Sequence, residues 1–208
     1  MTELELLKAG RRYNRNWIFR NLDLQLIEDS SLAILGPNGS GKSTLIQLLA
    51  GYLSPSEGTI SLRKNGKEID SSQIYRYISL AAPYIELLEE FSFQEQLAFN
   101  LSLKGSFGGY SEEYLIDRSG LKKAGNRPIK QFSSGMKQRV KLLLACSADT
   151  AIVLLDEPLT NLDQQGLLWY QELVRDFARG RTIVVASNNL AEYSFCEHRL
   201  SIEDYKNC

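Results

Sequence analysis

The sequence predicts an α/β fold in which helices surround a central, mostly parallel β-sheet. Two short runs, Ala151–Leu155 and Thr182–Ala186, are almost entirely apolar, as expected of parallel strands buried on both faces. A glycine-rich segment, residues 36–44, lies between a third apolar run and a helical pattern. This order of strand, loop and helix is typical of an α/β domain that holds a ligand at the loop.

The glycine-rich segment matches the phosphate-binding pattern G-x-x-x-x-G-K-[ST] at every position. The backbone N–H groups of such a loop, and of the helix that follows it, point at phosphate oxygens. Lys42 is expected to reach the β- and γ-phosphates, and the Ser43 hydroxyl is expected to ligate Mg²⁺. The sequence therefore predicts a P-loop NTPase that binds a nucleoside triphosphate. The nucleotide-binding residues are Gly36, Pro37, Asn38, Gly39, Ser40, Gly41, Lys42, Ser43 and Thr44.

Two strands, Leu4–Leu7 and Trp17–Ile27, are predicted before this loop. The second alternates apolar and polar side chains over part of its length, which indicates an antiparallel strand with one face in water. A polar turn with two aromatic side chains, residues 11–17, is predicted between them. Tyr13 has two possible roles, stacking on a nucleotide base, which we favour, and capping the sheet core. For Trp17 we favour packing.

Around and after the P-loop, the pattern predicts further strands and one helix. Ser31–Leu35 is a strand that leads into the loop, and Leu45–Ala50 is helical. The turn-rich residues 51–60 then lead into a strand, and Asn65-Gly66 is a strong signal for a β-hairpin. Tyr77–Leu80 is a further strand candidate. The alternating strand Trp17–Ile27 and this hairpin predict an antiparallel β subdomain beside the central sheet.

A small helical subdomain is predicted at about residues 84–130. Pro83 ends the preceding strand, and a helical pattern runs from about Gln94. Gly105–Gly109 form a flexible break, and Ser111 begins a second helix.

A further helix is predicted over Met136–Ala145, after Ser133, Ser134 and Gly135. Such a helix start can bind an anion or can be a plain N-cap. On these residues alone the plain N-cap is the better interpretation.

The apolar run that ends at Leu155 is followed by two acids, Asp156 and Glu157. Because ligands bind at the carboxyl ends of strands in such sheets, Asp156 is expected to hold Mg²⁺ and Glu157 to polarise the attacking water. The alternative is that both acids are exposed to solvent and have no role in catalysis. The run that ends at Ala186 leads into Ser187–Asn189 at the same edge. A helix and a last strand, Arg199–Ile202, finish the domain.

The composition is that of an ordinary globular protein, with 43% hydrophobic residues and a net charge of −1. This balance gives no electrostatic reason to expect nucleic acid as a partner. Cys146, Cys196 and Cys208 lack metal-ligand spacing, so we expect buried thiols and a loose tail. The acidic N-terminus is no signal peptide, and no apolar run is long enough to span a membrane. The expected location is cytoplasmic.

Together these motifs resemble those of the nucleotide-binding subunits of ABC transporters, of the small single-domain bacterial type. Residues 36–44 correspond to the Walker A motif, and Phe132–Met136 is similar to the signature loop usually written LSGGQ. Ala151–Glu157 resembles the Walker B strand with its catalytic glutamate, and Leu159–Asp163 resembles the D-loop. Tyr13 stands where this family has its adenine-stacking aromatic side chain.

The resemblance implies one ABC ATPase domain over residues 1–208, which forms a head-to-tail homodimer or heterodimer around two ATP molecules. Ser133 and the Gly135 amide of one subunit would complete the γ-phosphate site of the other, and Asp163 is counted among the nucleotide-binding residues. A separate transmembrane permease would insert a helix into a groove near residues 82–91. The chain would then lie peripherally on the inner face of the membrane.

Two positions depart from the family pattern. Ala82 stands where a glutamine normally contacts Mg²⁺ and the attacking water, and Asn188 stands where a histidine touches the γ-phosphate. His198 falls too late to replace that histidine and is expected to be structural. Because the P-loop is intact, ATP binding and hydrolysis are expected, with Glu157 and Asn188 as the catalytic residues, but hydrolysis is expected to be slow.

Two alternatives remain beside the transporter ATPase. The first is a degenerate regulatory module that binds ATP and hardly hydrolyses it. The second, which we favour least, is a soluble ABC ATPase that acts on nucleic acid or ribosomes.

Overall fold

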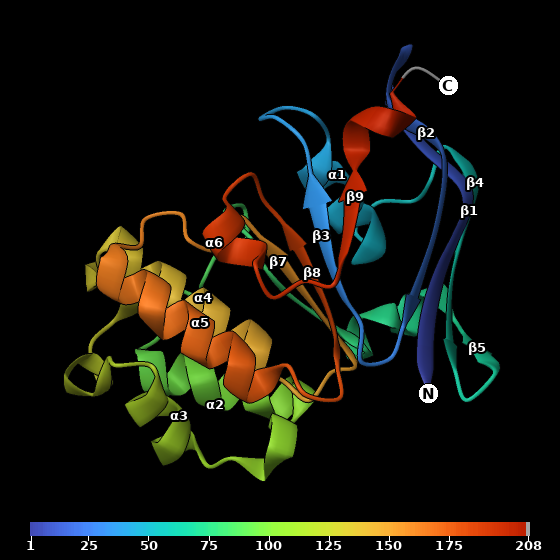
Figure 1. The fold of residues 1–208 in the computed structure, drawn as a ribbon. Helices are drawn as coiled ribbons and strands as arrows, with labels where there is room; N and C mark the ends of the chain where they lie inside the picture. The colour runs from blue at the N-terminus through green and yellow to red at the C-terminus, as the bar shows by residue number, and fades with distance from the viewer. Residues whose placement is uncertain (207–208) are drawn as a thin grey trace.

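The structure, a computed structural model, describes residues 1–206, so Cys208 lies outside the described residues. Its central sheet has five parallel strands in the order β6-β7-β8-β3-β9 (Figure 1). The strands span Ile78–Ala81 (β6), Ile152–Asp156 (β7), Thr182–Ala186 (β8), Ser31–Leu35 (β3) and His198–Ser201 (β9). The predicted parallel sheet is confirmed, and the bounds of β3 and β8 are as predicted.

The register of this sheet brings three strand ends to one edge. Asp156 pairs with Ala186, and the N–H of Ser187 donates to the carbonyl oxygen of Ile34. The residues that follow β3, β7 and β8 therefore lie close together. This edge is where ligands bind in open α/β sheets.

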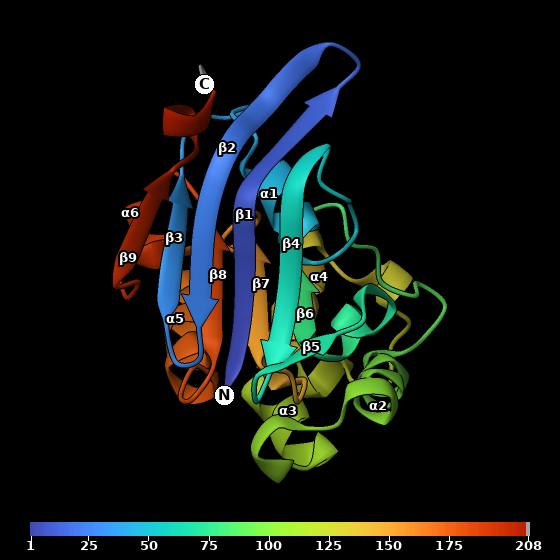
Figure 2. The ribbon, with the colours of Figure 1, turned by 90° about the vertical axis from the view of Figure 1, so that its right-hand side faces the viewer.

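A second, antiparallel sheet covers one face of the central sheet, as predicted (Figure 2). Its strands, in spatial order, are β2 (Asn16–Ile27), β1 (Thr2–Tyr13), β4 (Glu57–Lys64) and β5 (Lys67–Ile69). The predicted hairpin turn joins β4 to β5, where Asn65 and Gly66 both have the positive φ of a type I′ turn.

The β1–β2 hairpin differs from the prediction. The polar turn predicted over residues 11–17 is mostly strand, because Arg11 pairs with Phe19 and Arg12 with Trp17. The strand also begins earlier than predicted and continues through a bulge at Lys8, whose φ is +47°. A bulge interrupts the alternation of buried and exposed side chains, so the strand appears shorter from the sequence pattern than it is.

Six α-helices complete the described chain. Helices α4 and α5 cover the face of the central sheet opposite the antiparallel sheet, α2 and α3 lie beside them, and α1 lies between the two sheets (Figures 1 and 2). Helix α5 was not among the predicted elements. The helices span Lys42–Leu49 (α1), Phe93–Lys104 (α2), Glu112–Arg118 (α3), Ser134–Ser147 (α4), Gln164–Phe177 (α5) and Leu190–Tyr193 (α6). Short 3-10 helices span Ser71–Arg76, Phe107–Gly109, Lys122–Ala124, Ile129–Gln131 and Ile202–Tyr205.

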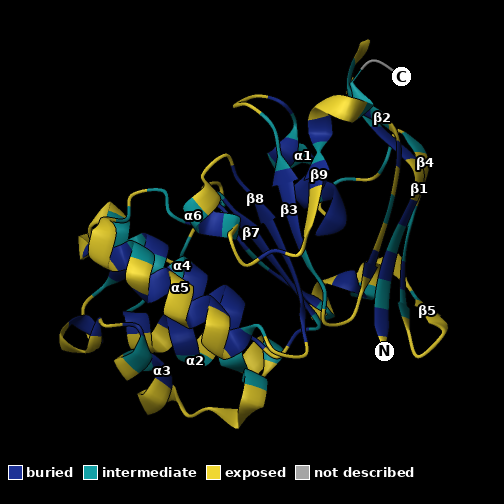
Figure 3. Cartoon of the chain, in the orientation of Figure 1, coloured by how far each residue is buried: buried dark blue, intermediate teal, exposed yellow. Residues whose placement is uncertain are grey.

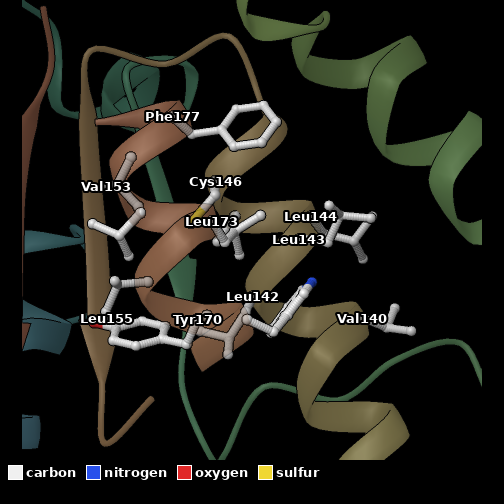
Figure 4. Packing of buried hydrophobic residues seen from close by; sticks show 14 of the residues in the cluster. Val140, Leu142, Leu143, Leu144, Cys146, Val153, Leu155, Tyr170, Leu173 and Phe177 are labelled. Carbon is white, nitrogen blue, oxygen red and sulfur yellow. The ribbon is translucent and has the colours of Figure 1, made fainter. Parts of the chain in front are cut away.

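The central strands separate two hydrophobic cores, and this explains their unbroken apolar sequence (Figure 3). On β7, Val153 and Leu155 face the helices, while Ile152 and Leu154 face α1 and the antiparallel sheet. Against the first pair, α4 and α5 pack large side chains such as Tyr170 (Figure 4). Burial of each such side chain contributes about 1.5–3 kcal/mol to folding.

Cys146 and Cys196 are buried free thiols, as expected. Burial raises the pKa of both to about 12, so neither is a reactive thiolate near neutral pH. Within residues 1–206, no helix has both the length and the apolar character needed to cross a membrane.

Candidate functional site

The P-loop turns sharply between β3 and α1. Gly36, Gly39 and Gly41 have φ values of +148°, +76° and +110°. Glycine adopts such conformations without a steric penalty, and the turn leaves the first N–H groups of α1 facing the loop. The loop has the backbone form of an anion cradle.

The Lys42 side chain is held inside this loop. It is 4% exposed, and its ammonium donates to the carbonyl oxygens of Gly36 at 2.8 Å and Pro37 at 3.1 Å. Ser40 is also buried, and its hydroxyl has no hydrogen-bond partner among residues 1–206. The cradle therefore presents a buried cation and a free hydroxyl beside its backbone donors.

Gly41 gives a direct test of the cradle. A Cβ at this position would lie 2.4 Å from Cγ2 of Ile18, and the φ of +110° adds strain of about 1–2 kcal/mol for any other residue. We expect Gly41→Ala to weaken ATP binding by about tenfold or more, measured by titration with a fluorescent ATP analogue. Gly66→Ala, at a positive φ in open space, is the matched control. Equal affinities of the two variants would contradict the prediction.

Asp156 ends β7 beside this cradle and is 1% exposed. Neither of its carboxylate oxygens has a hydrogen-bond partner in the part of the chain that the structure describes. Burial raises the pKa of Asp156, while the nearby Ser43 hydroxyl and Lys42 ammonium lower it. Because buried carboxylate oxygens without partners are costly, and because Mg²⁺ prefers oxygen ligands, the pair of Asp156 and Ser43 fits a magnesium ion.

Glu157 follows with a left-handed backbone, at φ +46°. Its N–H donates to the carbonyl oxygen of Ala186 at 2.9 Å, and its side chain is partly exposed. This conformation is uncommon for a residue with a side chain, and the neighbouring strand holds it in place. The chain thus turns at the strand end, with one acid buried and the next reaching toward solvent.

Asn188 lies in the loop that follows β8, next to the P-loop. Its amide Nδ2 donates to Oδ1 of Asn38 at 2.9 Å. The loop after β8 therefore contacts the phosphate cradle directly. His198 lies elsewhere, exposed on β9, where it pairs with Leu32.

Ser133, Gly135 and Asp163 form a separate group. Ser133 caps α4 by accepting from the N–H of Met136, and Asp163 caps α5 by accepting from the N–H of Gly166 at 2.8 Å. A Cβ on Gly135 would lie 2.9 Å from the carbonyl oxygen of Asn161, so the two segments touch. Among the described residues, no hydrogen bond joins this group to the P-loop.

Tyr13 and Trp17 lie on the β1–β2 hairpin in different environments. The Tyr13 side chain is 44% exposed, and the Arg11 guanidinium lies 4.9 Å from its ring centroid. Trp17 packs against Gly10 and stacks with Arg20 at 4.8 Å. Tyr13 is thus the more exposed of the two rings, with Arg11 against it.

Two residues near the site were not singled out from the sequence. Glu192 is 5% exposed, accepts from the N–H of Leu159 at 3.0 Å and so anchors the segment after Glu157. Burial raises its pKa. Tyr84 lies near Asp156. Neither belongs to a sequence motif, and only their position after a strand end could have drawn attention to them.

A glycine-rich loop before a helix, with a buried acid at the end of a neighbouring parallel strand, defines a P-loop nucleotide-binding protein. The chain matches the family model described as ABC transporter over residues 19–160, and it belongs to that family. It is therefore an ATP-binding subunit of the ABC transporter type, from a family of ATP hydrolases.

Two curated relatives illustrate the family. The chain is 29% identical over 203 residues to the lantibiotic transport ATP-binding protein SrtF of Streptococcus pyogenes, with 91% of this chain and 81% of that protein covered. It is 31% identical over 195 residues to the taurine import ATP-binding protein TauB of Ruegeria pomeroyi, with 88% of this chain and 69% of that protein covered.

Solved structures confirm the ABC ATPase fold. A putative ABC transporter ATP-binding protein from Pyrococcus furiosus superposes with a TM-score of 0.81 at 20% identity, covering 99% of this chain and all 100% of that one. A dimeric ATP-binding cassette bound to ADP and Pi gives a TM-score of 0.80 at 22% identity, covering 96% of this chain and 94% of that one.

Proposed function

We propose that this chain binds MgATP through residues 36–44 and hydrolyses it at the interface of a head-to-tail dimer, driving substrate movement through a separate membrane permease. One observation carries the proposal: the buried Asp156 carboxylate, without a partner in residues 1–206, lies beside Ser43 and Lys42 of the P-loop. A phosphate–magnesium pair supplies both the anion that the loop fits and the cation that Asp156 fits.

In this proposal each residue of the nucleotide site has one role. Lys42 leaves its carbonyl partners to hold the β- and γ-phosphates, and Ser43 and Asp156 hold Mg²⁺, which when bound neutralises phosphate charge. Glu157, which reaches toward solvent, orients and deprotonates the attacking water. Asn188 donates an amide N–H to the γ-phosphate, and Tyr13 stacks on the adenine.

The dimer follows from the separation of the two groups of residues. Ser133 is exposed at the start of α4, with no hydrogen bond to the P-loop of its own chain within the described residues. A helix start of this kind attracts phosphate. A second subunit in head-to-tail orientation would place Ser133, Gly135 and Asp163 against the γ-phosphate. Because each chain carries both halves, a second copy or a related subunit completes the two sites.

The permease is proposed to dock into a cavity of about 210 Å³ between the sheet and the helical subdomain. Exposed apolar side chains lie close by in sequence, among them Leu88, Phe99 and Leu103. Docking there would hold the chain peripherally on the inner face of the membrane. The cavity is lined in part by Ile85, Glu86, Leu87, Gln96, Asn100, Lys104 and Lys141.

The domain assignment belongs to the same proposal. Residues 1–208 form one ABC ATPase domain, and about residues 84–130 form its helical subdomain. This subdomain is tied together by the N–H of Ile129, which donates to the carbonyl oxygen of Phe91, and by the N–H of Gln94, which donates to the carbonyl oxygen of Gly125.

Slow hydrolysis is part of the proposal, because Ala82 is fully buried and has no polar side-chain atom. An amide at Asn188 cannot carry the positive charge of a histidine. The same two residues favour the degenerate regulatory module as the second candidate.

The test is steady-state ATP turnover of the wild type and of Asn188→His. A histidine restores a chargeable donor toward the γ-phosphate, so we expect turnover to rise roughly tenfold. Asn126→His, on an exposed loop, is the control and should leave turnover unchanged. A wild type that binds ATP without turnover, and is not activated by Asn188→His, would favour the regulatory module.

A further inference from the structure

The peptide bond between Pro158 and Leu159, just after Glu157, is held on both sides by buried side chains. Its carbonyl oxygen, from Pro158, accepts from Nε2 of Gln138 at 2.9 Å. Its N–H, from Leu159, donates to Oε1 of Glu192 at 3.0 Å. Gln138 is 4% exposed on α4, and Glu192 is 5% exposed on α6. Two helices that are remote in sequence therefore hold one peptide unit, which we call the 158–159 peptide.

The elements that carry these two side chains are themselves fixed. The N–H of Glu192 donates to the carbonyl oxygen of Asn189 at 2.9 Å, and the carbonyl oxygen of Glu192 accepts from the hydroxyl of Tyr170 at 2.8 Å. Tyr170 is fully buried on α5. Gln138 lies in the second turn of α4, where the helix is regular. A side chain on such a support holds its partner within a narrow range of positions.

The backbone of Glu157 needs support of this kind. Its φ of +46° is a left-handed conformation that is uncommon for a residue with a side chain. Such a conformation persists only where the surrounding structure holds it in place. On its N-terminal side, the N–H of Glu157 donates to the carbonyl oxygen of Ala186 at 2.9 Å. On its C-terminal side Pro158 has no N–H, so the 158–159 peptide is the first that can hydrogen-bond through both of its groups.

We propose that Gln138 and Glu192 are positioning residues for Glu157, which hold the 158–159 peptide so that the Glu157 carboxylate faces the attacking water. This role rests on the proposed function of Glu157 as the base. The two supports come from different parts of the site, because α4 begins at the residues proposed to meet the second subunit's nucleotide and α6 follows the loop of Asn188. A reacting group that is misplaced by about 1 Å can lose about 10²-fold in rate, so hydrogen bonds remote from the water affect the chemical step.

Gln138→Met and Glu192→Met test the two supports, because methionine keeps the length of either side chain and offers no donor and only a weak acceptor. We expect each variant to lower turnover at saturating ATP by about tenfold. Among the described residues neither side chain hydrogen-bonds to the P-loop, so affinity for the fluorescent ATP analogue should stay within about twofold of the wild type. Glu192→Gln keeps an acceptor oxygen for the N–H of Leu159 and should retain turnover within about threefold.

A double-mutant cycle separates this role from a general loss of stability. Because both side chains hold the same peptide, Gln138→Met combined with Glu192→Met should lower turnover by less than about 30-fold, whereas independent effects would multiply to about 100-fold. Turnover is divided by the number of sites that bind the analogue, so unfolded protein does not contribute. Thr182→Val is the control, since it removes a buried hydroxyl that donates to the carbonyl oxygen of Ile27 at 2.7 Å, at the other end of β8. It should leave turnover unchanged.

Turnover of the two methionine variants equal to that of Thr182→Val would overturn the positioning role, even if both variants melted at a lower temperature. A Glu192→Gln variant as slow as Glu192→Met would overturn it as well, because the acceptor oxygen would then not be what matters. Fully multiplicative losses in the cycle would contradict a shared support. If Glu157→Gln matches the turnover of the wild type, the proposed function of Glu157 fails, and this role with it. If Glu157→Gln is slow and the methionine variants are not, the positioning role alone fails.

Discussion

Glu157→Gln is expected to lower ATP turnover by at least about 10²-fold while ATP binding is retained. The amide keeps the shape of the side chain and its partly exposed position at φ +46°, but it cannot take a proton from water. The P-loop and Asp156 are unchanged by the substitution. A species that binds ATP and does not hydrolyse it should therefore accumulate as the closed dimer.

Three measurements check this expectation: turnover, equilibrium binding of the ATP analogue, and sedimentation with and without ATP. Glu68→Gln, exposed on β5, is the control for the loss of one negative charge. Turnover of Glu157→Gln within about threefold of Glu68→Gln would remove Glu157 from the chemical step. If ATP causes Glu157→Gln to dimerise but not the wild type or Glu68→Gln, the result would support the proposed interface.

Arg181→Met is expected to lower the free energy of unfolding by about 3 kcal/mol. Arg181 is 2% exposed, and its guanidinium donates five hydrogen bonds to groups at the ends of α4 and α5 and before β7. Each buried acceptor left without a donor costs about 1–3 kcal/mol. Burial lowers the pKa of Arg181 to about 10, so removing the desolvated cation offsets part of this loss. The acceptors are the carbonyl oxygens of Cys146, Ala148, Thr150 and Phe177 and the Thr150 hydroxyl.

Denaturant unfolding followed by circular dichroism measures this loss. Arg179→Met, two residues earlier and exposed, makes the same chemical change without disturbing those acceptors. We expect it to change stability by less than about 0.5 kcal/mol. If the two variants were equally stable, the hydrogen bonds of Arg181 would contribute nothing net to the fold.

Elements with a strong local signal were predicted well from the sequence. The apolar run at 182–186 is fully buried because both faces of β8 are covered, and such a strand has no polar alternation to obscure it. The Asn65-Gly66 turn is equally local, since its backbone angles suit few other residues. The P-loop combines both signals, an apolar strand before it and glycines whose backbone angles suit few other residues.

Elements that depend on partners were predicted less well. Residues 11–13 are polar and appear turn-like, but pairing with β2 makes them strand. Helix α5 was missed, although it buries Trp169, Tyr170, Leu173 and Val174 at helical spacing. Tertiary packing, rather than intrinsic propensity, supplies most of the stability of such a helix.

The sequence by itself determined the nature of the ligand, because phosphate binding needs glycines, a lysine and a hydroxyl at fixed spacing along one short segment. Only the tertiary structure decided which distant residues meet that segment. The contact of Asn188 with Asn38, the position of Tyr84 near Asp156 and the anchoring of Leu159 by Glu192 all join residues that are remote along the chain. The register of the parallel sheet brings such residues together, because it pairs strands that lie far apart along the chain.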